Sequence, residues 1–302
     1  MPVALAYFGV ILIWSTTPLA LQWSIAGGGF LFGVSSRMLL GGLLALALLR
    51  ALGKSLSFEP AARRTYLAAG LGIYASMICT YWAAQYIPSG WISVIFGLMP
   101  MATGLFAAIW LPGRAFSPAR VLGMLMGLVG LLVIFGRGVQ HHPQAVYGIL
   151  AVLLGTLSHA ASAVWIKRIS AGLDGLNVTV GGLGLAAPLF LLSWLLLDGE
   201  LPRHLPLQAG VAIGYLALIG SVLGFMLYYQ VLRQLEASRV ALITLVTPVS
   251  ALWLGHVFNQ EPLGVDVWTG TALILAGLVL HELGEPLLRA LRYRHGGWAN
   301  RL

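Results

Sequence analysis

Charge is scarce in this sequence. Acidic and basic residues together make up 9% of the 302 residues, whereas hydrophobic residues make up 59% and the mean hydropathy is +0.90. A soluble domain carries about 25% charged residues, so this chain lacks the polar side chains that would cover a water-exposed surface. The scarcity excludes a soluble globular protein and indicates an integral membrane protein. Long apolar runs predict helices rather than the short alternating strands of an outer-membrane barrel.

Other absences narrow the function. Cys79 is the only cysteine, which excludes an internal disulfide and a cysteine-based metal cluster. His141 and His142 are adjacent, and no metal-ligand spacing, nucleophile–base arrangement or phosphate-binding glycine loop is recognisable. We therefore expect no metal, no cofactor and no enzymatic activity. No acidic residue falls well inside an apolar run; Glu261 lies in a connection and Glu282 lies at the very end of the last run. A proton-coupled exporter of cations usually keeps an intramembrane carboxylate, so this class is disfavoured.

Ten runs approach the roughly 20 apolar residues that a transmembrane helix needs. Short connections that contain turn residues, such as Asp198-Gly199, separate them. The predicted spans are Val3–Leu21, Phe30–Leu49, Tyr66–Tyr86, Trp91–Trp110, Val121–Phe135, Val146–Ile166, Val178–Leu197, Ala209–Leu232, Val240–Phe258 and Val267–Leu283. We therefore predict an all-α integral membrane protein with ten transmembrane helices.

Lysine and arginine are unevenly distributed among the connections. With a cytoplasmic amino terminus, the outer connections hold only Arg137 and Arg203, and most other basic residues lie in inner connections. Because cytoplasmic loops carry the excess of positive charge, we expect both termini in the cytoplasm. The net charge of +8 is then explained by basic residues in cytoplasmic connections, where they set the orientation and contact anionic lipid. Nucleic acid is not an expected partner. Residues 285–302 are too polar to span and are predicted to form a basic cytoplasmic tail.

The two halves of the chain resemble each other. Five positions recur in register, with one deletion: Gly72, Tyr81, Pro100, Gly123 and Gly130 correspond to Gly220, Tyr229, Pro248, Gly270 and Gly277. Five spans per half force the second repeat, residues 146–284, to enter the membrane from the side opposite to the first, residues 3–136. Inverted repeats are typical of secondary transporters, whose substrate site lies near mid-membrane between the repeats. Because the duplication supplies both halves of such a unit, a monomer suffices.

Candidate substrate-binding residues lie within these spans. Aromatic side chains that converge on a cavity bind planar or amphipathic solutes by stacking, whereas those near span ends belong to the interfacial belt. His159 is expected either to hydrogen-bond a substrate or relay a proton, or to pack against a neighbouring helix. The predicted substrate-binding residues are Trp14, Thr17, Tyr74, Tyr81, Trp82, Met99, His159, Phe225, Tyr228 and Tyr229.

Arg37 is the one full charge well inside a predicted span. Its burial is costly, so we expect either a counter-charge, for a substrate carboxylate or a gating pair, or a structural residue that snorkels towards the outer surface. Pro18 interrupts the first span, and Pro100 and Pro248 occupy equivalent places in the two repeats. Proline inside a helix frees a carbonyl group and kinks the helix, so these three residues are predicted hinges.

With these features the chain resembles the EamA-type, ten-helix branch of the drug/metabolite transporter superfamily, over about residues 3–284. The motifs that carry the resemblance are Trp14 to Pro18, Arg37, Tyr86 to Pro100, Leu232-Arg233, Ala237, Thr247-Pro248-Val249, Glu261-Pro262-Leu263 and Gly270 to Gly277. The match departs at Gly113, which occupies the position of Glu261 in the first half. Glu261 is therefore expected to be an unpaired structural residue or counter-charge.

The resemblance implies an inner-membrane carrier with a central cavity, surrounded by spans one, three, four, six, eight and nine, with five and ten packed outside. Family members move amino acids, other metabolites or toxic compounds, usually outward. We expect a secondary transporter that exports a small amphipathic metabolite, such as an amino acid or aromatic compound, by alternating access. Its expected partners are that solute and membrane lipid. A multidrug exporter and a lipid-handling protein are the alternatives, and uniport, exchange and proton antiport through His159 all stay open.

Overall fold

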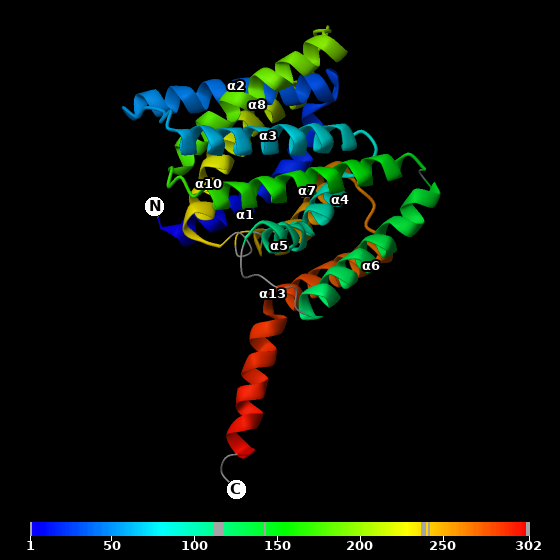
Figure 1. The fold of residues 1–302 in the computed structure, drawn as a ribbon. Coiled ribbons are helices and arrows are strands. Elements are labelled where there is room, and N and C mark those ends of the chain that lie inside the picture. Colours follow the sequence, from blue (N-terminus) through cyan, green and yellow to red (C-terminus); the bar gives the residue numbers. More distant parts are fainter. Residues whose placement is uncertain (1, 112–117, 142, 237–239, 241, 300–302) are drawn as a thin grey trace.

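The computed structural model in Figure 1 describes residues 2–111, 118–141, 143–236, 240 and 242–299. For residues 136–141, 242, 245, 282, 283 and 285–299 it describes the backbone alone. Within these ranges the chain forms helices and turns, without strands. Gly113 and Ala237 lie outside the described residues, so the first-half counterpart of Glu261 has no structural account.

The helices follow the predicted spans. The first half contains α1 (Val3–Ser24), α2 (Gly29–Ala51), α3 (Pro60–Ala83), α4 (Ser89–Phe96), α5 (Met99–Trp110) and α6 (Pro118–His141). The second half contains α7 (Ala145–Ile169), α8 (Gly175–Leu197), α9 (Leu207–Tyr215), the π-helix η1 (Leu216–Leu223), α10 (Gly224–Gln234), the 3-10 helix η2 (Leu242–Leu245), α12 (Thr247–Asn259) and α13 (Val265–Ala299). Three predicted spans are composite: α4 with α5, α9 with η1 and α10, and η2 with α12.

The outer surface of the bundle is apolar. Leu5, Phe8 and Leu12 are more than half exposed and lie one turn apart on α1, which is the pattern of a lipid-facing stripe. Among the described residues, seven helical stretches are long and apolar enough to cross a membrane by length and composition. The apolar part of α13, Val265–His281, is shorter, and α3 and α12 fall outside this group. The protein is thus an all-α, multi-pass membrane protein, and the count of ten crossings stays a prediction.

Helices α6 and α13 lie side by side at the edge of the bundle (Figure 1). A side chain at Gly123 would collide with the backbone of Gly277, one at Gly130 with that of Gly270, and the reverse collisions also occur. Small residues at such crossings let membrane helices approach closely. Gly123 is equivalent to Gly270 in the repeat, and Gly130 to Gly277, so the contacts exchange equivalent positions. A two-fold relation between equivalent helices would produce this exchange, and the inversion of the two repeats across the membrane stays a prediction.

Two composite spans begin a helix at a proline. Pro100 lies in the first turn of α5, and Pro248 lies in the first turn of α12. Proline is well tolerated there because the first N–H groups of a helix have no helical acceptor. Pro18 instead lies inside the continuous helix α1. The three predicted hinge residues therefore occupy two helix starts and one helix interior, and their role as hinges stays a prediction.

Candidate functional site

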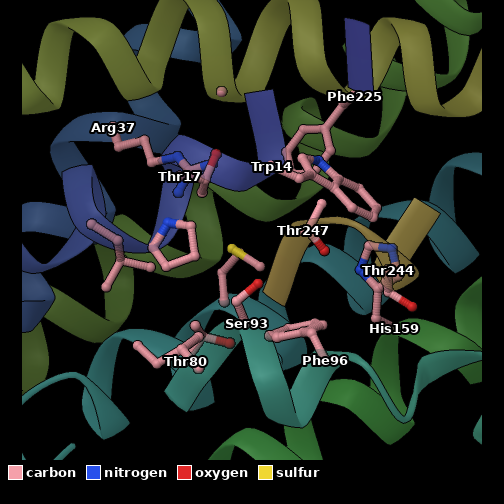
Figure 2. Close-up of a pocket in the computed structure, with 15 residues that line it drawn as sticks. Trp14, Thr17, Arg37, Thr80, Ser93, Phe96, His159, Phe225, Thr244 and Thr247 are labelled. Atoms are coloured by element: carbon pink, nitrogen blue, oxygen red, sulfur yellow. The ribbon is translucent and has the colours of Figure 1, made fainter. Parts of the chain in front are cut away.

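A cavity of about 70 Å³ lies between segments of both halves (Figure 2). Its walls come from α1, α2, α3, α4, α7, η1, α10, η2 and α12. None of the described side chains of α6 and α13, the fifth and tenth predicted spans, lines it. The family resemblance implied walls from spans one, three, four, six, eight and nine. The second span, α2, also borders the cavity, through Arg37.

Six of the residues singled out in the sequence line this cavity together. They come from four different helices, so only the fold brings them together. These residues are Trp14, Thr17, Pro18, Arg37, His159 and Phe225. Figure 2 shows Arg37 and Thr17 on one side of the space and Trp14, Phe225 and His159 on the other. The cavity therefore has a cationic side and an aromatic side.

The aromatic side is built around His159, which is buried. The imidazole lies edge-on to the Trp14 ring at a centroid distance of 5.8 Å and 5.1 Å from the Tyr228 ring. Trp14 and Tyr228 are themselves 5.1 Å apart. Neither His159 Nε2 nor the Tyr228 hydroxyl has a hydrogen-bond partner among the described residues. Buried polar atoms normally find partners, so this cluster can still accept or donate hydrogen bonds.

Arg37 forms the cationic side and is 2% exposed. Its Nε donates a hydrogen bond of 2.9 Å to Ser221 Oγ, and Nη1 donates a longer one of 3.4 Å to the Tyr81 hydroxyl. The guanidinium carbon also lies 5.9 Å from the centroid of the Tyr81 ring. The side chain thus points into the bundle and does not snorkel to the surface. Tyr81, a predicted binding residue, contacts Arg37 and is not itself a lining residue.

The π-helix η1 provides the surface against which Arg37 rests. Gly220 lies so close that an added Cβ would be 3.2 Å from Arg37 Nη2. The next residue, Ser221, accepts the hydrogen bond from Nε. A π-helical stretch is energetically unusual and is often found at functional sites. Here it brings a small residue and a hydroxyl group to the same guanidinium.

Pro18 gives the cavity wall on α1 an irregular backbone. Because proline has no N–H group, it cannot donate to the carbonyl of Trp14 one turn earlier. In the same turn, the hydroxyl of Thr17 donates to a neighbouring carbonyl, that of Ile13, at 2.7 Å. Hydroxyl groups commonly satisfy the backbone around prolines in membrane helices. The carbonyl that Pro18 leaves without its usual helical donor therefore belongs to the predicted binding residue Trp14, and Thr17 directly precedes the proline.

A comparison with protein families decides the classification. The model described as the EamA-like transporter family matches residues 1–136 and 146–281. The chain belongs to this family. It is therefore a member of the drug/metabolite transporter superfamily, as the sequence motifs indicate.

Relatives of similar length carry transporter names. The uncharacterized inner membrane transporter YedA of Escherichia coli (strain K12) is 27% identical over 296 residues, which cover 96% of this chain and 94% of YedA. The uncharacterized transporter YoaV of Bacillus subtilis (strain 168) is 26% identical over 282 residues, covering 92% and 96%. A solved structure without a functional name matches with a TM-score of 0.69 at 24% identity and covers 93% of this chain and 97% of its own. That likeness supports the fold alone.

In this EamA-family protein, four predicted binding residues lie away from the cavity. Tyr74 hydrogen-bonds Ser193 at 2.6 Å in the contact between α3 and α8. Trp82 lines a separate apolar groove between α3 and α7. Met99 is buried at the start of α5 and is not a lining residue. Tyr229 lines a second, more polar pocket that contains two basic residues. Tyr228 packs behind Trp14 and His159 rather than on the cavity surface.

The sequence reasoning also missed much of the wall. Short hydroxyl residues and one further aromatic residue line the space: Thr80, Ser93, Phe96, Thr244 and Thr247. Threonine and serine are common at helix contacts in membranes, so their presence within a span does not single out a cavity. Thr247 had the one recognisable signal, because it directly precedes a proline that recurs in both halves.

Glu261 is buried but lies outside the cavity wall. Its carboxylate accepts hydrogen bonds from the Ser89 backbone N–H at 3.0 Å, the Ser89 hydroxyl at 2.6 Å, the Gly90 N–H at 3.0 Å and Asn259 Nδ2 at 3.1 Å. These N–H groups open α4, where the unpaired donors and the helix dipole favour an anion. Glu261 therefore caps α4 from the connection between α12 and α13, which fits a structural residue.

Proposed function

We propose that this protein is a secondary transporter of the inner membrane that exports a small amphipathic metabolite, such as an amino acid or an aromatic compound. The proposal places both termini in the cytoplasm, in keeping with the basic inner connections. One polypeptide supplies both halves of the transport unit, so the proposed working form is a monomer surrounded by membrane lipid. Membership of the EamA-like transporter family supports the transport role.

The observation that carries the proposal is the central cavity. Residues from both halves line it, and its walls combine aromatic rings with hydroxyl groups and one cation. Secondary transporters built from inverted repeats place the substrate in such a position. Stacking on aromatic faces and hydrogen bonding at the opposite side together suit a solute with an apolar body and a polar end.

The size of the cavity supports alternating access. Its volume of about 70 Å³ admits a few water molecules, each of which needs about 10–15 Å³. Typical small-molecule sites have volumes of roughly 300 Å³ or more. A metabolite therefore enters only after the walls move apart, and we assign this motion to the helix starts at Pro100 and Pro248 and to the kink at Pro18. The contracted cavity then corresponds to a state between loading and release.

The test is flux across a membrane. The purified protein is reconstituted into liposomes, which are loaded with labelled amino acids, aromatic acids or amines. Liposomes without the protein serve as the control. We expect protein-dependent flux of at least one amphipathic solute. An imposed pH gradient separates proton antiport from uniport and exchange, and His159→Gln tests whether antiport depends on the imidazole. If the whole panel shows no protein-dependent flux, the exporter proposal fails.

Lipid handling is the weaker alternative. A lateral groove does run between α1, α9 and α12, with residues such as Trp23, Tyr215 and Phe258 along it. It shares no lining residue with the central cavity. A lipid pathway needs a lateral opening into the binding space, so the separation favours a small solute. Multidrug export of cations is disfavoured because the described lining residues include a cation and no carboxylate.

A further inference from the structure

The charge inventory of the cavity is one-sided. Among the described residues that line it, Arg37 is the cation, His159 is the titratable imidazole, and there is no carboxylate. An ion pair joins Lys54 to Asp174 and does not involve Arg37. A buried charge is strongly unfavourable unless it is paired and hydrogen-bonded. The cavity thus carries a positive charge for which the described residues supply no counter-ion.

The hydrogen bonds of Arg37 leave capacity for a ligand. A guanidinium has five N–H groups in a planar fork. The described residues accept from Nε, through Ser221, and from Nη1, through a 3.4 Å contact to Tyr81. None of the described residues accepts a hydrogen bond from Nη2, and the absence of a side chain at Gly220 lets η1 pack closely against it. Two neighbouring guanidinium N–H groups are the usual partner of a carboxylate in bidentate geometry.

The opposite side of the cavity suits an apolar body. Trp14 and Phe225 face Arg37 across the space in Figure 2, with His159 beside them. His159 Nε2 has no partner among the described residues, so the aromatic side also has hydrogen-bonding capacity. An anionic group at one end and a stacked ring at the other would use both sides together.

We propose that the transported solute carries a carboxylate attached to an apolar, preferably aromatic, body, and that Arg37 binds the carboxylate. The inference rests on the proposed transport function and names the substrate class of the same cavity. One guanidinium neutralises one negative charge, which favours a monocarboxylate over a phosphate dianion. The π-helix η1 contributes by holding Ser221 and the unsubstituted Gly220 against the guanidinium.

The experiment compares pairs of molecules that differ in the carboxylate alone. Binding to purified protein in detergent is measured by calorimetry for 3-phenylpropanoate against 3-phenylpropanol, and for phenylalanine against phenethylamine. In the native protein, each carboxylate-containing member is expected to bind about tenfold or more tightly than its partner, the usual strength of hydrogen bonds to a charged group. In Arg37→Gln this preference disappears. Equal affinity within both pairs, no binding of either carboxylate, or an unchanged preference in Arg37→Gln overturns the inference.

Three further variants separate binding from folding. Arg37→Lys keeps the charge but loses the planar fork, so an intermediate preference is expected. Gly220→Ala keeps Arg37 but places a methyl group 3.2 Å from Nη2, so the guanidinium must shift slightly and carboxylate binding should weaken; a melting temperature measured on the same preparation shows whether the variant is folded. Arg50→Gln removes the same charge from the exposed end of α2 and should bind like the native protein. An Arg50→Gln effect as large as that of Arg37→Gln would contradict a local role.

The two proposals fail in different ways. Absence of flux for the whole panel, together with a preserved carboxylate preference in binding, removes the transport function and leaves the anion site standing. Flux that is equally fast for phenethylamine and phenylalanine, and for the alcohol and the acid, removes the substrate class and leaves the transporter.

Discussion

Arg37 and Glu261 are both buried charged side chains, but the protein surrounds them very differently. The Glu261 carboxylate accepts four hydrogen bonds, two of them from the backbone N–H groups of Ser89 and Gly90. The Arg37 guanidinium donates to Ser221 and, at 3.4 Å, to Tyr81. Burial alone therefore does not define the role of a charge in the membrane. Glu261 has a full set of hydrogen-bond donors and fits a structural role, whereas Arg37 keeps N–H groups that a ligand can use.

Position agrees with this difference. Glu261 lies in the connection after α12 and ties it to the first turn of α4, whereas Arg37 lies within α2 and borders the cavity. Glu261 thus stabilises the arrangement of helices around the cavity. Arg37 contributes a charge whose cost of burial a substrate can offset. The two residues give opposite expectations for stability and for binding.

Removing the satisfied charge should have the largest effect on stability. In Glu261→Ala the N–H groups of Ser89 and Gly90 lose their acceptor, so we expect a loss of about 3 kcal/mol or more in the free energy of unfolding, since each unsatisfied buried donor costs about 1–3 kcal/mol. Thermal unfolding in detergent measures it. Glu59→Ala is the matched control, because Glu59 precedes α3, is exposed and makes no side-chain cap. Equal stability of the two variants would refute the cap.

Losing only one of the hydrogen bonds to Glu261 should destabilise the protein less than losing the whole carboxylate. Ser89→Ala removes the hydroxyl that donates to Glu261 at 2.6 Å and keeps the backbone N–H groups. We expect destabilisation of about 1 kcal/mol, the net value of a typical hydrogen bond. The melting temperature in detergent should therefore fall between those of the native protein and Glu261→Ala. A loss as large as that of Glu261→Ala would mean that the hydroxyl, rather than the helix start, holds the carboxylate.

Removing the incompletely paired charge should cost still less stability. Arg37→Met retains much of the side-chain volume and removes the buried charge, and such replacements are often neutral or stabilising. We expect the unfolding free energy to stay within about 1 kcal/mol of the native value while carboxylate binding is lost. Thermal unfolding and calorimetry on the same preparation give both quantities. Severe destabilisation would show instead that Arg37 is a structural residue held by Ser221 and Tyr81.

The exposed pair Lys54–Asp174 provides the smallest expected effect. Burial raises the pKa of Asp174, but hydrogen bonds from Lys54 and Asn177 and the Lys54 charge outweigh it and lower the pKa overall. A carboxyl whose pKa falls on folding stabilises the protein above its unfolded pKa and loses this contribution as the pH falls through the folded value.

Asp174→Asn keeps a helix-capping side chain at the start of α8 and removes the charge. The variant should therefore lose about 0.5 kcal/mol or less at pH 7. Its difference from the native protein should stay level down to about pH 5 and disappear as the pH falls through the folded-state pKa of Asp174, which lies below its ordinary value. Melting temperatures measured along this pH range check the sign. A difference that grows on acidification would contradict it.

The sequence predicted the helices well because the membrane imposes their length and composition. It was less able to predict which face of a helix meets the cavity. Tyr81 and Trp82 are adjacent, so their side chains point about 100° apart on α3. Tyr81 contacts Arg37, whereas Trp82 lines a groove away from the cavity. A stripe of aromatic residues in the sequence therefore gives the direction of a helix face only to within about 100°. The packing of the helix against its neighbours decides which of these residues meets the cavity.

By itself, the sequence determined the class of protein, the family motifs and the repeated pattern of glycines and prolines. These follow from local properties: apolar length, the distribution of basic residues and the geometry of small residues. Only the tertiary structure decided that Arg37 borders the cavity and that Glu261 caps α4, because their partners Ser221 and Ser89 lie far away in the sequence. Hydrogen bonds between distant segments depend on how helices cross and rotate, and that geometry is a property of the packed bundle.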